Sequence, residues 1–268
     1  MTRNAADPAP PGPRILLRYA AESHVAHVSI DNPAKLNALD PGLLGALAEM
    51  LTRLGADPEL RAVVLGSTGD KAFVGGADID TMAGLDRERA AGFITLVHRA
   101  CRAVRDLPVP VIARLQGFVL GAGMELAAAC DLRVAAESAR FGMPEVRLGI
   151  PSVVEAALLP GLIGWGRTRE LLLLGEIYGA AELQQWGFLN RVVPDGALDS
   201  AVDALLHAML AAGPQAVRRQ KRLIAAWEDL PLGAAIDAGI DAFAAAWETD
   251  EPARMLGEFQ AKRRRRSD

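Results

Sequence analysis

Cysteine is scarce in this chain, which carries Cys101 and Cys130 as its only two among 268 residues. Two cysteines are too few for a disulfide framework or a cysteine-rich zinc site, and such scarcity is typical of proteins in a reducing cytoplasm. We therefore expect two core thiols and a cytoplasmic location.

Long apolar runs are also lacking. No stretch approaches the roughly 20 uninterrupted apolar residues that a membrane helix needs, and the N-terminal segment MTRNAADPAPPGPR has no apolar signal-peptide core. We predict a disordered Pro-rich tail over residues 1–13. The remaining composition, 51% hydrophobic and 23% charged residues, predicts a soluble protein with a full core and no membrane partner.

An excess of positive charge is absent, because the formal net charge is −4. This argues against general nucleic-acid binding. The segment KRRRR at 262–266 is a local exception, and its simplest interpretation is a solvated helix end.

Histidines with metal-ligand spacing are missing as well. His24, His27, His98 and His207 are scattered, and no serine lies in a G-x-S-x-G elbow. We interpret the histidines as ordinary strand and helix residues, and the sequence supports neither a metal site nor a serine nucleophile.

Alternating apolar runs and helical patterns are present instead. Short Val- and Ile-rich runs predict strands at 14–20, 24–30, 61–67, 110–119 and 132–137. Apolar residues at helical spacing predict helices at 41–57 and 91–107 within this α/β region, and at 198–213, 214–230 and 231–250 beyond it. The helical tail needs cover for its apolar faces, from the core or from another subunit.

Two glycine-rich stretches follow predicted strands. FVGGADI, at 73–79, either turns sharply or presents bare backbone N–H groups. In GFVLGAGMELAAACDLRVA, at 117–135, the strand breaks at Gly121 and Gly123 and a helix begins, whose first turn offers free N–H groups. A dinucleotide fingerprint is disfavoured, because Leu126 occupies the place of the third glycine.

Two glutamates accompany these stretches. Taken alone, Glu125 is explained as a capping residue and Glu145, after Pro144, as a first-turn acid. Taken together, two glutamates near backbone donors are suited to general acid/base chemistry on a carbonyl compound. Their apolar neighbours would help either one to hold a proton near neutral pH.

Five segments together resemble the enoyl-CoA hydratase/isomerase (crotonase) superfamily. They follow the family order over almost the whole chain after residue 13: NPAKLNAL (32–39), KAFVGGADI (71–79), GFVLGAGMELAAACDLRVAAESARFGMPEVRLGIP (117–151), GFLNRVVP (187–194) and GEFQAKRR (257–264). The resemblance implies an α/β crotonase-like spiral of ββα units over 14–195, followed by a helical oligomerisation region over 196–268.

The resemblance also assigns roles to residues. It implies backbone oxyanion donors at Ala77 and at Ala122, where the family has glycine. It implies that Glu125 helps to activate a water molecule and that Glu145 delivers the proton to C2 of the substrate. The implied activity is hydration of a trans-2-enoyl-CoA to a 3-hydroxyacyl-CoA, with no metal or redox cofactor and with coenzyme A as part of the substrate.

The implied CoA and substrate contacts lie in several segments: Lys35, Leu36 and Ala38; Gly76, Asp78, Ile79 and Gly121; Pro144 and Ser152; and Phe259 and Lys262. Lys35 is either a neighbour of the CoA pyrophosphate or ribose, or a solvated lysine. Phe259 and Lys262 match a helix that in relatives reaches the CoA of a neighbouring subunit, so the resemblance implies a homotrimer or a hexamer built as a dimer of trimers.

One segment departs from the family pattern. Many relatives continue after the second glutamate with a glycine-rich run, whereas this chain reads LGIPSVVEAALLP, with Ser152 in the altered wall and a third acid, Glu155. Glu155 is either part of the altered site or a helix-start acid. The alternatives to hydration are enoyl-CoA isomerisation, other acyl-CoA lyase or hydrolase chemistry, and, more remotely, RNA binding through the basic tail.

Overall fold

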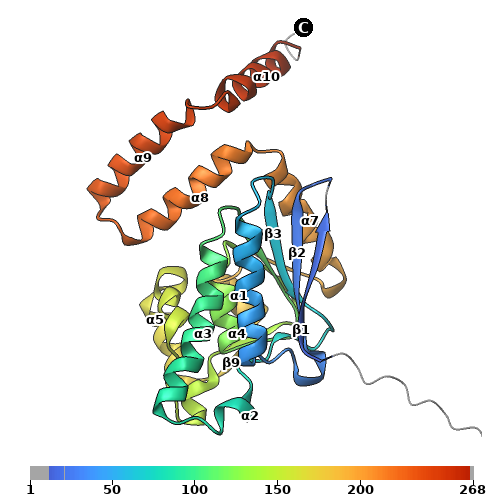
Figure 1. Ribbon diagram of the computed structural model, residues 1–268, viewed down its shortest axis with the longest axis vertical. Coiled ribbons are helices and arrows are strands. Elements are labelled where there is room, and N and C mark those ends of the chain that lie inside the picture. Colours follow the sequence, from blue (N-terminus) through green and yellow to red (C-terminus); the bar gives the residue numbers. More distant parts are fainter. Residues whose placement is uncertain (1–11, 21, 266–268) are drawn as a thin grey trace, which may run out of the picture.

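Two sheets form the centre of the protein in the computed structural model, which describes residues 12–20 and 22–265 (Figure 1). The tail predicted at 1–13 falls mostly outside the described residues, as does Arg266 of the basic segment. The six-stranded sheet has the order β1 (Arg14–Ala20), β2 (Val25–Asp31), β3 (Ala62–Ser67), β5 (Val111–Leu115), β7 (Leu132–Ala136), β10 (Arg191–Val193). The four-stranded sheet has the order β4 (Ala72–Val74), β6 (Phe118–Leu120), β8 (Arg140–Gly142), β9 (Ile177–Gly179).

The α-helices follow the chain as α1 (Pro41–Gly55), α2 (Ile79–Met82), α3 (Arg87–Arg105), α4 (Ala122–Ala128), α5 (Leu159–Leu174), α6 (Ala180–Gln185), α7 (Leu198–Leu210), α8 (Pro214–Asp229), α9 (Leu232–Ala246) and α10 (Glu251–Arg265). Short 3-10 helices are η1 (Pro33–Lys35), η2 (Pro144–Leu148), η3 (Val154–Leu158) and η4 (Asp195–Ala197).

The strands repeat in pairs. β3, β5 and β7 pair in parallel in the larger sheet, and each is followed by a strand of the smaller sheet, β4, β6 or β8, which also pair in parallel. Helices follow the first two pairs and return the chain to the larger sheet, whereas after β8 the chain passes through α5, β9 of the smaller sheet and α6 before it reaches β10. This repetition produces a spiral of ββα units.

Each face of the larger sheet has its own helical cover. Val63 and Leu65 of β3 belong to the main core with α1, α3 and α4, whereas Val64 packs with α7 residues Leu198 and Val202. Successive side chains of a strand point to opposite faces, so a strand that is apolar at every position is covered on both sides. Figure 1 shows α1 and α3 on one side of the sheet and α7 on the other.

The predicted strand at 110–119 is wrong as a single element. It divides into β5 and β6, which belong to different sheets, and Gly117 lies between them with a φ of +57°. A Cβ atom at Gly117 would lie 2.1 Å from the Lys71 carbonyl oxygen, so this corner requires glycine.

The helix predicted at 91–107 begins earlier, at Arg87. Asp86 caps it by accepting a hydrogen bond of 2.9 Å from the backbone N–H of Arg89. The predicted helix at 41–57 is confirmed as α1, with Leu43, Leu47 and Leu51 among its buried residues.

The C-terminal helices extend away from the sheets. α8 crosses above the core, and α9 and α10 stand apart from it (Figure 1). Glu251, at the start of α10, accepts hydrogen bonds from the backbone N–H groups of Gln215 and Ala216 at the start of α8. No helix within 12–20 and 22–265 is long and apolar enough to cross a membrane.

Candidate active site

The loop that precedes α1 supports the first glycine-rich stretch. Leu36 and Asn37 have positive φ angles of 54° and 56°. The Asn37 side chain holds this conformation, because it accepts a hydrogen bond from the backbone N–H of Asn32 and donates to the carbonyl oxygens of Thr68 and Ala72. Such a buried, fully bonded amide fixes a backbone that asparagine tolerates well.

A short backbone ladder joins this loop to residues 75–78. The N–H groups of Gly75 and Asp78 donate to the carbonyl oxygens of Leu36 and Leu39, and the N–H of Leu39 donates to Gly76. Because N–H groups alternate in direction along an extended segment, the Ala77 N–H points away from Leu39. Ala77 also lines the cavity described below, which leaves its N–H suited to bind a ligand oxygen.

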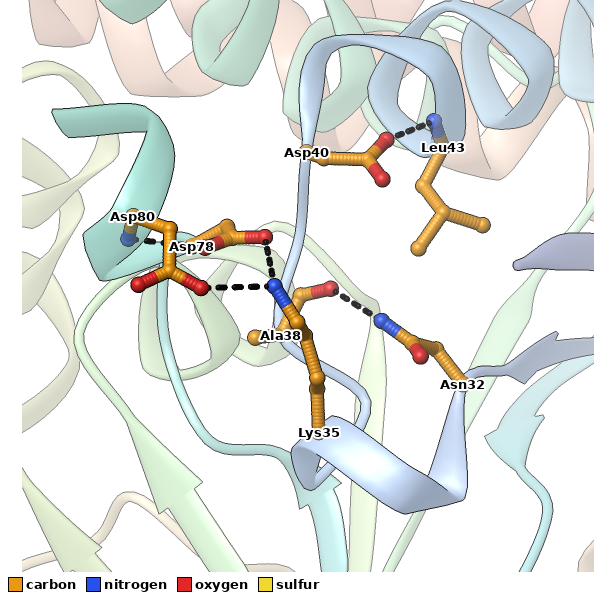
Figure 2. Close-up of polar contacts among 7 residues, drawn as sticks. All are labelled: Asn32, Lys35, Ala38, Asp40, Leu43, Asp78 and Asp80. Carbon is orange, nitrogen blue, oxygen red and sulfur yellow. Dashed lines mark hydrogen bonds and ion pairs between the residues drawn. The ribbon is translucent and has the colours of Figure 1, made fainter. Parts of the chain in front are cut away.

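Lys35 forms ion pairs beside this ladder (Figure 2). Its Nζ lies 3.0 Å from Oδ2 of Asp78 and 2.8 Å from Oδ2 of Asp80. Asp78 also caps α2 by accepting a hydrogen bond of 2.9 Å from the backbone N–H of Asp80. Lys35 is therefore engaged by protein carboxylates, while its side chain stays half exposed.

The second glycine-rich stretch makes a tight turn at Gly121, with φ 51° and ψ −120°. A Cβ atom on Gly121 would lie 2.5 Å from Oε1 of Glu145, so the missing side chain lets the carboxyl group approach the backbone. α4 begins at Ala122, within the break predicted at Gly121 and Gly123, and all seven of its residues are buried. The Ala122 N–H belongs to the first turn of this helix, where backbone donors have no partner within the helix.

Glu125 and Glu145 approach one cavity from different elements. Glu125 projects from α4 and is 4% exposed, and Glu145 projects from η2. Oε2 of Glu145 accepts a hydrogen bond of 2.8 Å from Oγ of Ser152. Both side chains line the cavity. The local explanations made from the sequence, a capping role for Glu125 and a first-turn acid for Glu145, do not account for this position.

Burial raises the pKa of both carboxyl groups. The pKa of Glu125 is raised from 4.5 to about 8, mainly by burial and then by the charge of Glu145. The backbone amides of Ala156 and Val153 act in the opposite direction, because they favour the ionised form. Burial also raises the pKa of Glu145, and its own backbone N–H and the Ser152 hydroxyl oppose that rise. Two such groups resist simultaneous ionisation and can share one proton near neutral pH.

The cavity has a volume of about 710 Å³ and is mostly apolar. It brings together nine of the predicted site residues: Gly76, Ala77, Ile79, Gly121, Ala122, Glu125, Pro144, Glu145 and Ser152. Its apolar wall comes largely from Met82, Leu85, Phe93, Ile94, Val97, Leu148, Ile150 and Val153. A cavity of this size, with a few convergent polar groups, is typical of a small-molecule site.

The other predicted contacts lie outside this lining. Lys35, Leu36, Ala38 and Asp78 belong to the adjoining ladder and loop. Phe259 and Lys262 lie on α10, which stands away from the core in Figure 1. The contribution of α3 to the wall was not predicted, because the helical pattern at 91–107 does not say what its apolar face meets.

Glu155 and His98 form a contact that sequence reasoning missed. Oε1 of Glu155 lies 2.8 Å from Nδ1 of His98, and the two residues are separated by 57 positions in the chain. Glu155 is therefore more than a helix-start acid, and His98 is more than an ordinary helix residue. The part of the chain that the structure describes contains no group of three or more His, Cys, Asp or Glu that could hold a metal ion.

The chain matches the enoyl-CoA hydratase/isomerase family over residues 20–266. It is 34% identical to the crotonyl-CoA hydratase of Syntrophomonas wolfei and 32% identical to the short-chain-enoyl-CoA hydratase of Clostridium acetobutylicum, each over 91% of this chain and 94% of the relative. An enoyl-CoA hydratase structure from Mycobacterium smegmatis superposes with a TM-score of 0.90 at 30% identity, covering 93% of this chain and 97% of that one.

The chain therefore belongs to the enoyl-CoA hydratase/isomerase family, and the predicted crotonase-like α/β fold is confirmed.

Proposed function

We propose that this protein is an enoyl-CoA hydratase, which adds water syn across the C2=C3 bond of a trans-2-enoyl-CoA. The observation that carries the proposal is the cavity itself, where Glu125 and Glu145 meet the backbone of Ala77 and Ala122. The hydratase names of the Syntrophomonas wolfei and Clostridium acetobutylicum relatives support it.

The oxyanion donors act on the thioester. The N–H groups of Ala77 and Ala122 bind the thioester oxygen, and the π electrons of C2=C3 move toward that oxygen as a nucleophile adds at C3. Donors that are already in place stabilise the resulting enolate without reorganisation, and removal of one such donor typically costs about 3–4 kcal/mol of barrier.

The glutamates move the protons. In the reactive state the one proton that the pair shares lies on Glu145, and Glu125 is ionised although burial raises its pKa. Glu125 accepts a proton from water as the water oxygen bonds to C3, and Glu145 gives its proton to C2 as the enolate collapses. Transfer of one proton from Glu125 back to Glu145 restores the starting enzyme. The product gains one hydrogen and one hydroxyl group, so the reaction needs no oxidant, reductant or metal, and coenzyme A takes part only as the carrier of the acyl group.

The acyl-CoA substrate extends from the cavity over neighbouring segments. The 32–39 loop, with Lys35, Leu36 and Ala38, lies next to the Ala77 ladder and would flank the CoA moiety. Asp78 and Asp80 hold Lys35 in ion pairs, so we propose that its main role is to fix the conformation of this loop and that contact with a CoA phosphate is secondary.

The exposed C-terminal helices are proposed to meet other copies of the chain. α9 exposes Leu232, Ile236, Ile240, Phe243 and Trp247, and α10 exposes Leu256 and Phe259. Apolar surface of this extent needs cover. In a homotrimer, or a hexamer of two trimers, Phe259 and Lys262 would approach the CoA of a neighbouring subunit. We further propose a cytoplasmic location, where Cys101 and Cys130 stay reduced.

The deciding experiment follows the loss of conjugated-enoyl absorbance when the protein meets short, medium and aryl trans-2-enoyl-CoA thioesters. Glu125→Gln and Glu145→Gln keep the side-chain shape and remove the acid/base function, so each is expected to lower kcat by at least about 100-fold. Glu137→Gln, at an exposed glutamate, is the matched control and keeps full activity.

Absence of hydration by the wild type on every thioester, with acyl-CoA binding intact, would overturn the hydratase proposal. Formation of a shifted double bond in place of the 3-hydroxyacyl product would identify an isomerase. Activity that survives in both glutamine variants would leave hydration standing and refute the roles given to the glutamates.

A further inference from the structure

Glu155 is a buried acid that the mechanism above does not use. Its side chain is 5% exposed, and only Oε1 is bonded, to Nδ1 of His98 on α3. Its Oε2 is buried and lacks a hydrogen-bond partner among the described residues. A buried carboxylate is costly unless it is paired, and removal of one member of such a pair exposes that cost.

The turn that carries Glu155 also touches the proposed base. The backbone amides of Val153 and Ala156 lie against the Glu125 carboxyl group, where they favour its ionised form. The Ala156 N–H additionally bonds to the Val153 carbonyl oxygen at 2.9 Å, which closes the turn around Glu155. One short segment therefore holds Glu125 through its backbone and His98 through a side chain.

The same turn is conformationally strained. Val154 has a φ of +39°, in the left-handed region that β-branched residues avoid. Such a conformation persists only where the surroundings hold it, and it occurs often at functional sites. The Glu155–His98 contact is a side-chain tie between this turn and α3, whose residues Ile94 and Val97 line the cavity.

We propose that His98 and Glu155 are positioning residues for the hydration reaction, because their contact fixes the turn 153–156 whose amides hold the Glu125 carboxyl group in the cavity. This inference rests on the proposed hydratase function. It assigns neither residue to direct contact with the substrate.

The pair also sets the charge around Glu125. Glu155 faces Glu125 from η3, His98 and Cys101 face Glu155 from α3, and Glu145 acts on Glu125 from η2. The charge of Glu155 contributes to the raised pKa of Glu125 and of the Cys101 thiol. Loss of that charge alone should make Glu125 easier to ionise.

The first test separates geometry from charge. Glu155→Gln keeps an oxygen that can accept a hydrogen bond from His98, so kcat at the pH optimum is expected to stay within about threefold of wild type. Because Glu125 must be ionised to accept a proton, the acidic limb of the kcat/KM profile should move to lower pH, by about half a unit.

Variants that break the tie should behave differently. In Glu155→Ala and His98→Ala, kcat is expected to fall roughly tenfold while KM stays within about twofold, since the loss lies in the orientation of Glu125. His207→Gln, at an exposed histidine on α7, is the control and should match wild type. Unchanged kcat in both alanine variants, or an unmoved acidic limb in Glu155→Gln, would overturn the proposal.

A second readout does not depend on turnover. In the substrate-free protein, the infrared carbonyl stretch of the protonated Glu125 carboxyl is identified by its loss in Glu125→Gln. Its titration midpoint should move to lower pH in Glu155→Gln and stay in place in His207→Gln. If wild type fails to hydrate any thioester and this midpoint still moves, the hydratase function fails but the link to Glu125 stands. An unmoved midpoint in an active enzyme would refute the link.

Discussion

At the scale of single residues, the Glu125 carboxyl group couples the chemistry of the site to the stability of the fold. Burial raises its pKa from 4.5 to about 8. Between these values the folded protein keeps a proton that the unfolded chain releases. Stability from this group is therefore complete below about pH 4.5 and is lost as pH rises toward 8.

A stability difference between wild type and Glu125→Gln should reveal this coupling. The variant has no group to ionise at this position. The difference in free energy of unfolding between the variant and wild type should therefore shift in favour of the variant by roughly 2–4 kcal/mol from pH 5 to pH 8. Urea unfolding at a fixed protein concentration checks this, with Glu137→Gln as the exposed control. Stability curves for Glu125→Gln and wild type that run parallel across this range would show that Glu125 keeps an ordinary pKa.

The residues of the site differ in how far the sequence could predict them. Gly121, Glu125 and Glu145 lie in one segment whose motif is specific, and the structure brings all three to one cavity. His98 and Glu155 carry no local signal, because their contact depends on how α3 packs against η3 across 57 positions. Long-range packing of this kind is not encoded in any short pattern.

At the scale of elements, α4 depends on a cation buried behind it. Arg133 of β7 is 5% exposed. Its Nη1 donates to the carbonyl oxygens of Cys130 at 2.6 Å and Ala127 at 3.4 Å, and its Nε donates to Phe188 at 2.6 Å. One acceptor, the Ala127 carbonyl, lies in the last turn of α4, at the negative end of the helix dipole.

Replacement of Arg133 should destabilise the protein by more than the loss of its packing contacts alone. Arg133→Met fills similar space but removes the guanidinium donor from the three carbonyls, of which Ala127 still accepts from the Cys130 N–H, so the free energy of unfolding should fall by about 3 kcal/mol. Arg140→Met is the matched control, because Arg140 also donates to two carbonyls but is exposed. This variant should lose little free energy of unfolding. Equal losses in urea unfolding of the two variants would contradict this role for Arg133.

The element boundaries show where local patterns stop being informative. The amphipathic pattern of α1 suffices to predict it, because one face is lined by leucines. The five short strands β4, β6, β8, β9 and β10 have three residues each, too few for a periodic signal. The corner at Gly117 was hidden because apolar residues resume directly after it, and the close approach of the Lys71 carbonyl shows that the chain turns there.

At the scale of the whole molecule, the exposed apolar face of α9 is the observation that most supports the proposed oligomer. Leu232 and Phe243 are 78% and 68% exposed. Together with Ile236, Ile240 and Trp247 they fall within one stripe at 100° per residue, whereas Asp241 lies on the opposite side of the helix. The sequence could predict an amphipathic helix here, but its lack of cover within the chain required the structure.

Charge placed in this stripe should dissociate the assembly. Ile240→Asp combined with Phe243→Asp would bury two carboxylates in an apolar contact, so sedimentation should change from a trimer or hexamer to a monomer. Asp241→Lys, on the opposite side, is expected to leave the mass unchanged. A wild-type monomer at micromolar concentration would refute the proposed assembly.

The same double variant also tests whether a neighbouring subunit completes the site. If it is a folded monomer, its KM for enoyl-CoA should rise, because Phe259 and Lys262 would no longer reach a neighbour's CoA. An unchanged KM would show that α10 assembles the protein without completing the site.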